Sequence, residues 1–439
     1  MKILCPDYVK NILDTFHQAG FQAYIVGGCV RDALLNLTPK DYDVTTNAKP
    51  EQVQALFERT IPTGIAHGTI TILSDQPVEV TTFRQESMYS DHRHPDHVAF
   101  VNDLTEDLAR RDFTINAMAY DPKTGLIDPF GGQADLKAQR IRAVGDPYQR
   151  FQEDALRMLR AHRFAARFHF QIETQTEKAI QQLHEDIQYV SVERVRHEVL
   201  EILRSNPYEI ENMTLLLSHW MPELESCRTC LQQTPYHDTN VLHHILRAVK
   251  LLDPFDETLA WTLLFHDLGK PACHTTKNGI DHFKGHPAKS AEISSRICKE
   301  FKMTNTQKKV IPLLVRYHDE KMKDPLAFIR KFRIEKHWSD AWIKQLFIVK
   351  YCDIMAHSVY GQQTIKKLET LEDCYQGCDR PMEYSQLAIN GKDIVENTNL
   401  SGKDIANALQ ACLEYAFDHP EKNHKTDLFV YIESRYPWK

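Results

Sequence analysis

The sequence predicts an α+β protein, in which a small head built on a mixed sheet precedes an all-helical neck, body and tail. Strand-like runs crowd into the first part of the chain, with helix-like stretches between them; they read FQAYIV, YDVTT, GTITIL and VEVTTF. From about Phe151 onward the pattern is helical, with long amphipathic segments such as VERVRHEVLEILRS and NVLHHILRAVKLL. Because 439 residues exceed what one ordinary core holds, several domains are expected.

Clusters of turn residues suggest where these domains meet. They lie near Gly145-Asp146-Pro147, Asn206-Pro207 and Arg380-Pro381. The predicted division is therefore a catalytic head (1–145), a neck (146–206), a body (207–380) and a tail (381–439).

Composition narrows the class of protein. Hydrophobic residues make up 42% of the chain and no apolar run is long enough to cross a bilayer, so no membrane partner is expected. The first residues lack the layout of a signal peptide, which favours a cytoplasmic location. The spacing of the ten cysteines does not suggest a disulfide framework. Cys227 and Cys230 have the spacing of a redox or zinc pair, but no second pair lies at a matching interval, so reduced thiols are expected. The net charge of −7 argues against a surface that is basic throughout and would bind nucleic acid by charge alone. It still allows a local basic stripe.

The stretch VGGCVRDALLNLTPKDYDV (26–44) combines residue types suited to phosphoryl transfer. Asp41 and Asp43 alternate along a strand-like run, so their carboxylates point to the same face, and divalent cations relieve the repulsion between them. Two such ions can clamp the attacking and leaving oxygens of a phosphoryl transfer. Gly27 and Gly28 let the backbone approach a triphosphate, and Arg31 can pair with a phosphate oxygen. A lone Asp-x-Asp is a weak signal, but this combination is much stronger.

A third acid is needed if the site resembles that of other metal-dependent polymerases. Glu79, in the strand-like run VEVTTFR, is the candidate.

The opening stretch resembles the signature of the nucleotidyltransferase superfamily, and specifically of the class II CCA-adding tRNA nucleotidyltransferases and the bacterial poly(A) polymerases. RRDFTINAMAYDPKTGLIDPFGG (110–132) and RFQEDALRMLRAHRFAARF (150–168) resemble the next blocks of that family, in the same order. The resemblance implies metal-dependent transfer of a nucleotide to an RNA 3′ hydroxyl, with loss of pyrophosphate. It implies Mg²⁺ ligands at Asp41 and Asp43, and triphosphate contacts at Gly28, Arg31 and Arg111.

The block around Asp154 indicates how a base could be chosen without a template. Positions three apart share a helix face, so Asp154, Arg157, Arg160 and Arg163 are predicted to line one side. Cytosine and adenine both place an amino donor beside a ring-nitrogen acceptor, which suits a carboxylate next to a guanidinium. The resemblance assigns base reading to Asp154 and Arg157, base or phosphate contacts to Arg160 and Arg163, and the orientation of Arg157 to Glu153.

Three segments favour CCA addition to tRNA, from CTP and ATP, over poly(A) synthesis. The first segment, PTGIAHGT (62–69), is similar to the corresponding stretch of the CCA-adding enzymes. The second, ESMYSDHRHPDHVAF (86–100), is similar to the mobile loop that these enzymes need for the switch from C to A. The third, residues 387–425, is similar to their tail that contacts tRNA. Addition of the final A alone, and poly(A) synthesis, stay open as alternatives.

A second constellation centres on LLFHDLGKP (263–271). Histidine and carboxylate together suit a hydrolytic metal site, and the ordered set resembles an HD-superfamily phosphohydrolase. That resemblance implies core metal ligands at His244, His266, Asp267 and Asp353, with His286 and His318 completing a wider or binuclear site. The spacing favours His244 over the adjacent His243. The metal is not specified, the implied substrates are RNA ends or cyclic phosphates, and an inactive HD fold is the alternative.

Overall fold

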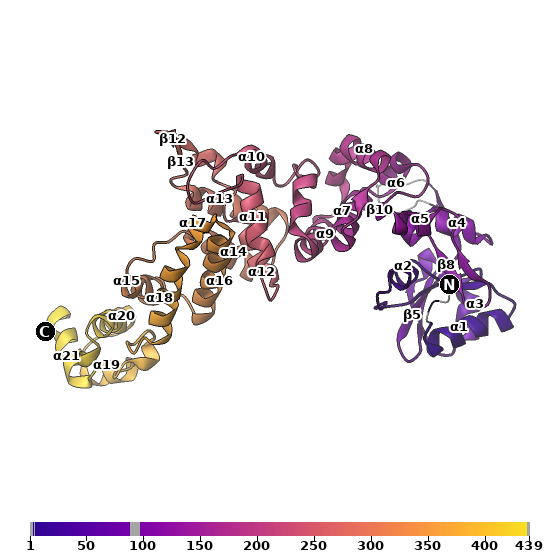
Figure 1. Ribbon diagram of the computed structural model, residues 1–439. Helices are drawn as coiled ribbons and strands as arrows, with labels where there is room; N and C mark the ends of the chain where they lie inside the picture. The colour runs from indigo at the N-terminus through magenta and orange to yellow at the C-terminus, as the bar shows by residue number, and fades with distance from the viewer. Residues whose placement is uncertain (1–2, 4, 88–96, 437–439) are drawn as a thin grey trace. The chain divides into compact units, whose positions relative to one another are not determined.

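The computed structural model describes residues 3, 5–87 and 97–436, which form two compact units. Unit 1 comprises residues 1–225 and 300–302, and unit 2 comprises 226–299 and 303–439. Figure 1 labels their elements.

A seven-stranded mixed sheet forms the base of unit 1, in the order β3-β4-β5-β2-β1-β8-β9. β2 and β5 run parallel, and the other neighbouring pairs run antiparallel. The strands are β1 (Ala23–Val26), β2 (Asp43–Thr46), β3 (Thr60–Gly64), β4 (Thr69–Leu73), β5 (Pro77–Thr82), β8 (Ala119–Asp121) and β9 (Gly125–Ile127). A separate ribbon pairs β6 (Arg84–Ser87) with β7 (His97–Phe100).

Short helices accompany this sheet, and an apolar cluster that includes Val26, Phe83 and Leu108 joins it to α4. These helices are α1 (Asp7–Gln18), α2 (Gly28–Leu34), α3 (Pro50–Leu56), η1 (Ile65–His67), α4 (Leu104–Ala109), η2 (Thr114–Asn116) and α5 (Gly132–Lys137).

Helices dominate the rest of unit 1. α7 packs against α9, and α6 packs against α8. The elements are β10 (Arg140–Ile141), α6 (Pro147–Glu153), α7 (Leu156–Phe168), β11 (Gln171–Ile172), α8 (Thr174–Leu183), η3 (His184–Tyr189), α9 (Val192–Ser205) and η4 (Pro207–Met213). α10 (Glu223–Thr229) lies at the boundary of the two units.

Unit 2 is built around α12 (Glu257–Phe265), whose residues from Leu259 onward are all buried. A helix that is apolar on every side requires neighbours all around it, and α11 (Val241–Lys250), α14 (Asn305–Tyr317) and α16 (Asp340–Ala356) supply them. The remaining elements are η5 (Pro271–Cys273), β12 (Thr275–Lys277), β13 (Ile280–His282), α13 (His286–Glu300), α15 (Pro325–Ile329), the π-helical turn η6 (Arg330–Glu335), α17 (Val359–Gln362), α18 (Ile365–Gln376) and η7 (Tyr384–Gln386).

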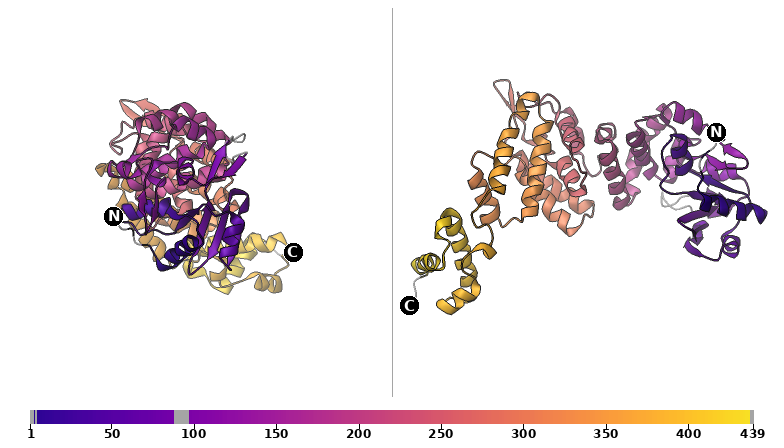
Figure 2. Two further views of the ribbon diagram at one scale, coloured as in Figure 1. Left: turned by 90° about the vertical axis from the view of Figure 1, so that its right-hand side faces the viewer. Right: turned by 60° about the horizontal axis from the view of Figure 1, so that its bottom comes forward.

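The C-terminal helices of unit 2 group together, as the right-hand view of Figure 2 shows in yellow. They are α19 (Gly391–Asn397), α20 (Lys403–Asp418), η8 (Pro420–Lys422) and α21 (Lys425–Arg435). The predicted fold class, a mixed-sheet head followed by helices, is confirmed. Two short strand pairs, β10–β11 and β12–β13, are additions that the helical pattern did not predict. Among the described helices, none has the length and apolar character to cross a bilayer.

Candidate functional site

The glycine pair forms the turn between β1 and α2. Gly27 has a φ of 75°, and a Cβ atom built on it would lie 3.1 Å from Nη1 of Arg111. A side chain here would therefore be strained and would push against this arginine. The sequence places glycine at this position because the backbone passes directly beside Arg111.

Two of the three predicted acids, Asp43 and Glu79, lie on adjacent strands of the sheet. Asp43 begins β2 and is paired in register with Glu79 on the parallel strand β5, while Asp41 lies two residues before Asp43. Desolvation, together with repulsion from Asp41 and Glu79, raises the pKa of Asp43 to about 6, although Arg111 opposes the rise. The sheet thus gathers negative charge at one point, which is the electrostatic condition for binding a divalent cation.

A cavity of about 460 Å³ opens beside Asp43 and is lined mainly by arginine. Its arginines are Arg31, Arg110, Arg111, Arg157, Arg160, Arg163, Arg167 and Arg194, with Gly27, Gly28, Asp43, Asp112, Asn116, Asp154 and Phe164 between them. Arg31 is buried, pairs with Asp32 at 2.7 Å and lies over the ring of Phe168. Except for Asp41 and Glu79, the structure brings every predicted residue of the nucleotide site into this lining.

Two of these guanidinium groups retain buried N–H groups without a partner. Nε of Arg111 and Nη1 of Arg194 make no hydrogen bond to any residue that the structure describes. Buried donors are normally satisfied, and guanidinium groups pair preferentially with phosphate and carboxylate oxygens. The cavity is therefore suited to an anionic ligand.

The prediction that Asp154 shares a helix face with the three arginines is wrong. α6 ends at Glu153, and Asp154 is extended, with φ −143° and ψ 103°. Its side chain accepts a hydrogen bond from the backbone N–H of Leu156 at 3.0 Å, so a local side-chain contact competes with continuation of the helix. Arg194 of α9 donates to the other carboxylate oxygen at 3.0 Å and keeps Asp154 at the cavity.

Buried carboxylates hold the arginines of α7 in place. Arg157 donates to Glu153 at 2.7 Å, which is the contact expected of an orienting residue. Arg160 bonds to Asp112, and Arg163 to Glu198. Burial opposes ionisation of Asp112, but Arg160 and Asn116 hold the pKa of its carboxyl well below the ordinary value. Asp112, Glu198 and Arg194 lie far from α7 in the sequence, so spacing alone gave no signal for them.

Replacing Asp112 by alanine is expected to lower the free energy of unfolding by about 2–3 kcal/mol, because the partly exposed Arg160 then loses its charge-assisted hydrogen bonds to this buried carboxylate. Urea denaturation measures the change. The control is Asp146→Ala, which removes the exposed N-cap of α6 and should cost only about 1 kcal/mol. Equal losses for the two variants would contradict a buried charge pair.

In unit 2, six predicted ligands converge within one cluster. They are His244 of α11, His266 and Asp267 after α12, His286 at the start of α13, His318 after α14 and Asp353 of α16. Nδ1 of His266, His286 and His318 lies 2.6, 2.8 and 2.7 Å from a backbone carbonyl three residues earlier. Since a carbonyl only accepts, Nδ1 carries the hydrogen and Nε2 is left with a lone pair for a metal.

Asp267 joins two halves of this cluster. Its Oδ1 lies 3.1 Å from Nε2 of His286 and 3.5 Å from Nε2 of His318. Its Oδ2 lies 3.4 Å from Nε2 of His244 and 3.2 Å from Nε2 of His266. Asp267 is buried, and its Oδ2 also forms an ion pair with Nζ of Lys270 at 2.6 Å. Two imidazole nitrogens and one carboxylate oxygen on each side are a donor set that would suit divalent cations.

Within this cluster the histidines and carboxylates pair with one another. Although burial disfavours the cation, Asp267 and Asp353 raise the pKa of His266 to about 10, so a metal that bound Nε2 of this ring would displace a proton. The pKa values of Asp267 and Asp353 lie well below their ordinary value, because neighbouring histidines oppose the effect of burial. A buried Lys350 donates to the backbone carbonyls of His318 and Glu320, each at 2.7 Å, and thereby fixes the segment that carries His318.

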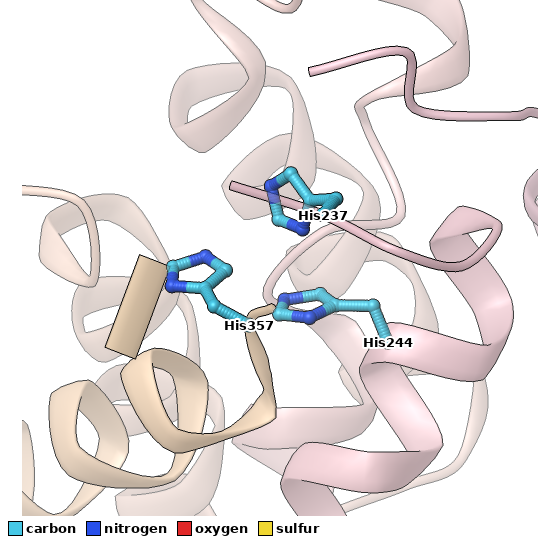
Figure 3. Close-up of side chains that lie close together, drawn as sticks. All are labelled: His237, His244 and His357. Atoms are coloured by element: carbon cyan, nitrogen blue, oxygen red, sulfur yellow. The ribbon is translucent and has the colours of Figure 1, made fainter. Parts of the chain in front are cut away.

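Two further histidines, missed by the sequence reasoning, lie beside His244. Figure 3 shows the rings of His237, His244 and His357 grouped together, and the ring centroids of His237 and His357 are 4.6 Å apart. Burial lowers the pKa of His357 to about 4, so that ring is neutral at neutral pH. In the sequence, the signal for these two residues was only that they stand at the two ends of the histidine-rich interval.

The loop predicted to serve the switch from C to A lies mostly outside the described residues, at 88–96. Its described flanks form the β6–β7 ribbon.

Three family models match the chain: the poly A polymerase head domain at residues 23–142, the probable RNA and SrmB-binding site of polymerase A at 169–227, and the HD domain at 236–357. Among curated proteins, the CCA-adding enzyme of Lactobacillus helveticus is 54% identical over 44% of this chain and 48% of its own length. That of Bacillus pumilus is 44% identical over 57% of this chain and 64% of its own length. The chain thus matches about half the length of these relatives.

Solved structures match over nearly the whole chain. The CCA-adding enzyme of Bacillus stearothermophilus, in complex with CTP, is 26% identical with a TM-score of 0.74 and 98% coverage of both chains. The Thermotoga maritima CCA-adding enzyme, complexed with tRNA, is 20% identical with a TM-score of 0.62 and 99% coverage of this chain and 97% of its own, and supports the fold alone. The chain thus carries matches to a poly A polymerase head domain, a probable RNA-binding region and an HD domain in this order, and it is similar to the CCA-adding enzymes.

Proposed function

We propose that the chain adds CCA to the 3′ end of tRNA from CTP and ATP. The observation that carries the proposal is the register of β2 and β5, which pairs Asp43 with Glu79 next to a cavity lined by arginine. The similarity to the CCA-adding enzymes, one of them in complex with CTP, supports the choice of substrate.

Asp41 and Asp43 would hold Mg²⁺, which when bound supplies Lewis-acid stabilisation of the transferring phosphoryl group. Arg111 and Arg31 bind the triphosphate and offset the charge that develops on it. Gly27 keeps the backbone free of a side chain where Arg111 must reach the phosphates. Glu79 adds a third carboxylate beside Asp43.

Base selection belongs to Asp154 and Arg157. The carboxylate of Asp154 accepts from the amino group of cytosine or adenine, and Arg157 donates to the neighbouring ring nitrogen. Uracil and guanine would place a carbonyl oxygen against this carboxylate, and an acceptor facing an acceptor is strongly rejected. The hydrogen bonds of Arg194 to Asp154 and of Arg157 to Glu153 support this assignment.

Incorporation of each nucleotide into a tRNA transcript that lacks CCA tests the proposal. We expect Mg²⁺-dependent incorporation of CTP, followed by ATP, and none of GTP or UTP. Incorporation of ATP alone, without prior addition of C, would favour the A-adding or poly(A) alternatives.

A second proposed activity is phosphohydrolysis at the HD cluster. The supporting observation is Asp267, whose two buried oxygens face two separate histidine pairs. Divalent cations bound there would activate water and polarise a phosphoryl oxygen. The donor set is compatible with several transition metals, so metal identity is a matter for measurement.

Adjacent histidines provide a matched pair of variants. His244→Ala removes a buried ring whose Nε2 lies 3.0 Å from Asp353, and it is expected to lower metal content and HD hydrolysis at least about a hundredfold. His243→Ala, one residue earlier on α11, should retain both. Metal analysis by mass spectrometry and phosphate release check the pair, and the opposite ranking would assign the ligand to His243.

A further inference from the structure

Asp107 of α4 is a buried carboxylate to which the proposed reaction gives no role. Its side chain is completely buried, and each of its oxygens faces an arginine of the nucleotide cavity. Nε and Nη2 of Arg110 donate to Oδ1 at 3.0 and 2.8 Å, and Nη2 of Arg111 donates to Oδ2 at 3.4 Å. Although burial opposes ionisation of Asp107, Arg110 and Arg111 keep its pKa below the ordinary value. The buried charge is therefore retained because two cavity arginines pair with it.

The same carboxylate contacts the strand that carries Asp43. Oγ1 of Thr45 lies 3.2 Å from Oδ2 of Asp107, and Thr45 follows Asp43 by two residues on β2. Since alternate residues of a strand lie on one face of the sheet, Asp43 and Thr45 share a face. The backbone N–H of Arg84, at the start of β6, lies 3.4 Å from Oδ1. Asp107 thus connects the strand of the metal-binding acids with the arginines of the cavity.

Arg111 is held at one end by Asp107 and confined at the other by the backbone. Within the described part of the chain, Asp107 is the one carboxylate within salt-bridge distance of Arg111. A Cβ atom at Gly27 would lie 3.1 Å from Nη1 of Arg111, so this nitrogen passes directly beside the glycine turn. Arg111 also opposes the rise in the pKa of Asp43, which places its charge within electrostatic reach of that acid. Its Nε is buried and makes no hydrogen bond to a described residue, so the fixed guanidinium keeps a donor for a ligand.

We infer that Asp107 is the positioning residue for Arg111 in nucleotide binding, and that it holds the guanidinium where a triphosphate can lie between Arg111 and the metal-binding acids. The inference rests on the proposed nucleotidyl transfer and adds a residue that acts through Arg111. Asp107 does not itself line the cavity. A long arginine side chain loses conformational freedom when it binds a phosphate, and a fixed counter-ion removes part of this cost before the nucleotide arrives.

Replacing Asp107 by asparagine tests the inference through binding rather than activity. The substitution keeps the size of the side chain, and its carbonyl oxygen can still accept from Arg110. Its NH₂ group then faces Nη2 of Arg111, donor against donor, so Arg111 loses its acceptor. Equilibrium binding of CTP and of CMP to the full chain is measured with Mg²⁺ and without tRNA. We expect Asp107→Asn to bind CTP about tenfold more weakly and CMP unchanged, because CMP lacks the terminal phosphates.

The matched control is Glu106→Gln, which makes the same chemical change at an exposed position of the same helix and should bind both nucleotides normally. Circular dichroism confirms that each variant is folded. Equal weakening of CTP and CMP binding in Asp107→Asn would show a general structural role and overturn the inference, as would unchanged CTP binding. Failure of the unmodified chain to bind CTP would instead contradict the proposed nucleotidyl transfer itself.

A cycle of double variants tests whether Asp107 acts through Arg111. Arg111→Ala alone should weaken CTP binding at least about tenfold. Adding Asp107→Asn to it should change the affinity less than about twofold, because the group that Asp107 positions is already absent. Losses that multiply would mean that the two residues act independently, and would contradict the inference.

Thr45→Val provides a second test that does not depend on the folding of Asp107→Asn. Valine keeps the volume of threonine but removes the hydroxyl beside Oδ2 of Asp107. We expect CTP binding to weaken about threefold while CMP binding stays the same. Unchanged CTP binding in the folded Thr45→Val variant would contradict the role assigned to this contact.

Discussion

Replacing Asp43 by asparagine is expected to reduce nucleotide incorporation at least about a thousandfold. The substitution preserves size but removes a charge that would hold Mg²⁺, and a bound metal contributes several kcal/mol to the stabilisation of a phosphoryl transition state. Single-turnover incorporation of CTP into a tRNA transcript measures the loss.

Protein stability provides the internal control for Asp43→Asn. Because the pKa of Asp43 in the folded protein is raised to about 6, its ionised form destabilises the folded state at neutral pH. Removing the charge should therefore leave the unfolding temperature unchanged or slightly higher while activity is lost. Full activity of the Asp43→Asn variant would exclude this carboxylate from metal binding, and a large drop in unfolding temperature would assign the loss to misfolding.

Replacing Asp154 by asparagine is expected to relax the choice of base. The amide of asparagine can donate to the O4 atom of uracil, which the carboxylate cannot do. Because Arg157 still presents a donor to the N3–H of uracil, the gain is partial, and we expect the ratio of UTP to CTP incorporation to rise about a hundredfold. Competition between the two nucleotides on one transcript measures this ratio.

Arg194→Ala is the matched variant for Asp154→Asn. It removes the guanidinium that positions Asp154 but leaves the carboxylate as an acceptor. The KM for CTP should rise while the ratio of UTP to CTP stays within about threefold of the original. A similar relaxation in both variants would mean that the position of Asp154, rather than its hydrogen-bonding pattern, determines selection.

Much of the fold and of the candidate site follows from local patterns. Asp41 and Asp43 are two residues apart and the glycine pair precedes a short helix, so these residues could be singled out from the sequence, but β2 begins only at Asp43 and the strand period does not apply to Asp41. The position of Glu79 could not be predicted from local patterns, because it lies opposite Asp43 only through the parallel register of β2 and β5.

The parts that the sequence did not reveal depend on contacts between distant segments. Asp112 lies 48 residues from its partner Arg160, and Arg194 lies 40 residues from Asp154. The break at Asp154 was missed because a side-chain hydrogen bond, rather than a glycine or proline, interrupts the helix. In the HD cluster the residue types marked the candidate ligands, but the position of Asp267 between two histidine pairs emerges only when α11, α12, α13 and α14 come together.

The measurement that tests the central proposal most directly is incorporation on three tRNA transcripts, ending before CCA, after C and after CC, with sequencing of each product. The proposed function predicts that three, two and one nucleotides are added, in the order C, C, A, and that every product then stops. Addition of A only to the transcript ending in CC would instead identify an A-adding enzyme. Long A tracts on all three would contradict CCA addition and place the chain with the poly(A) polymerases.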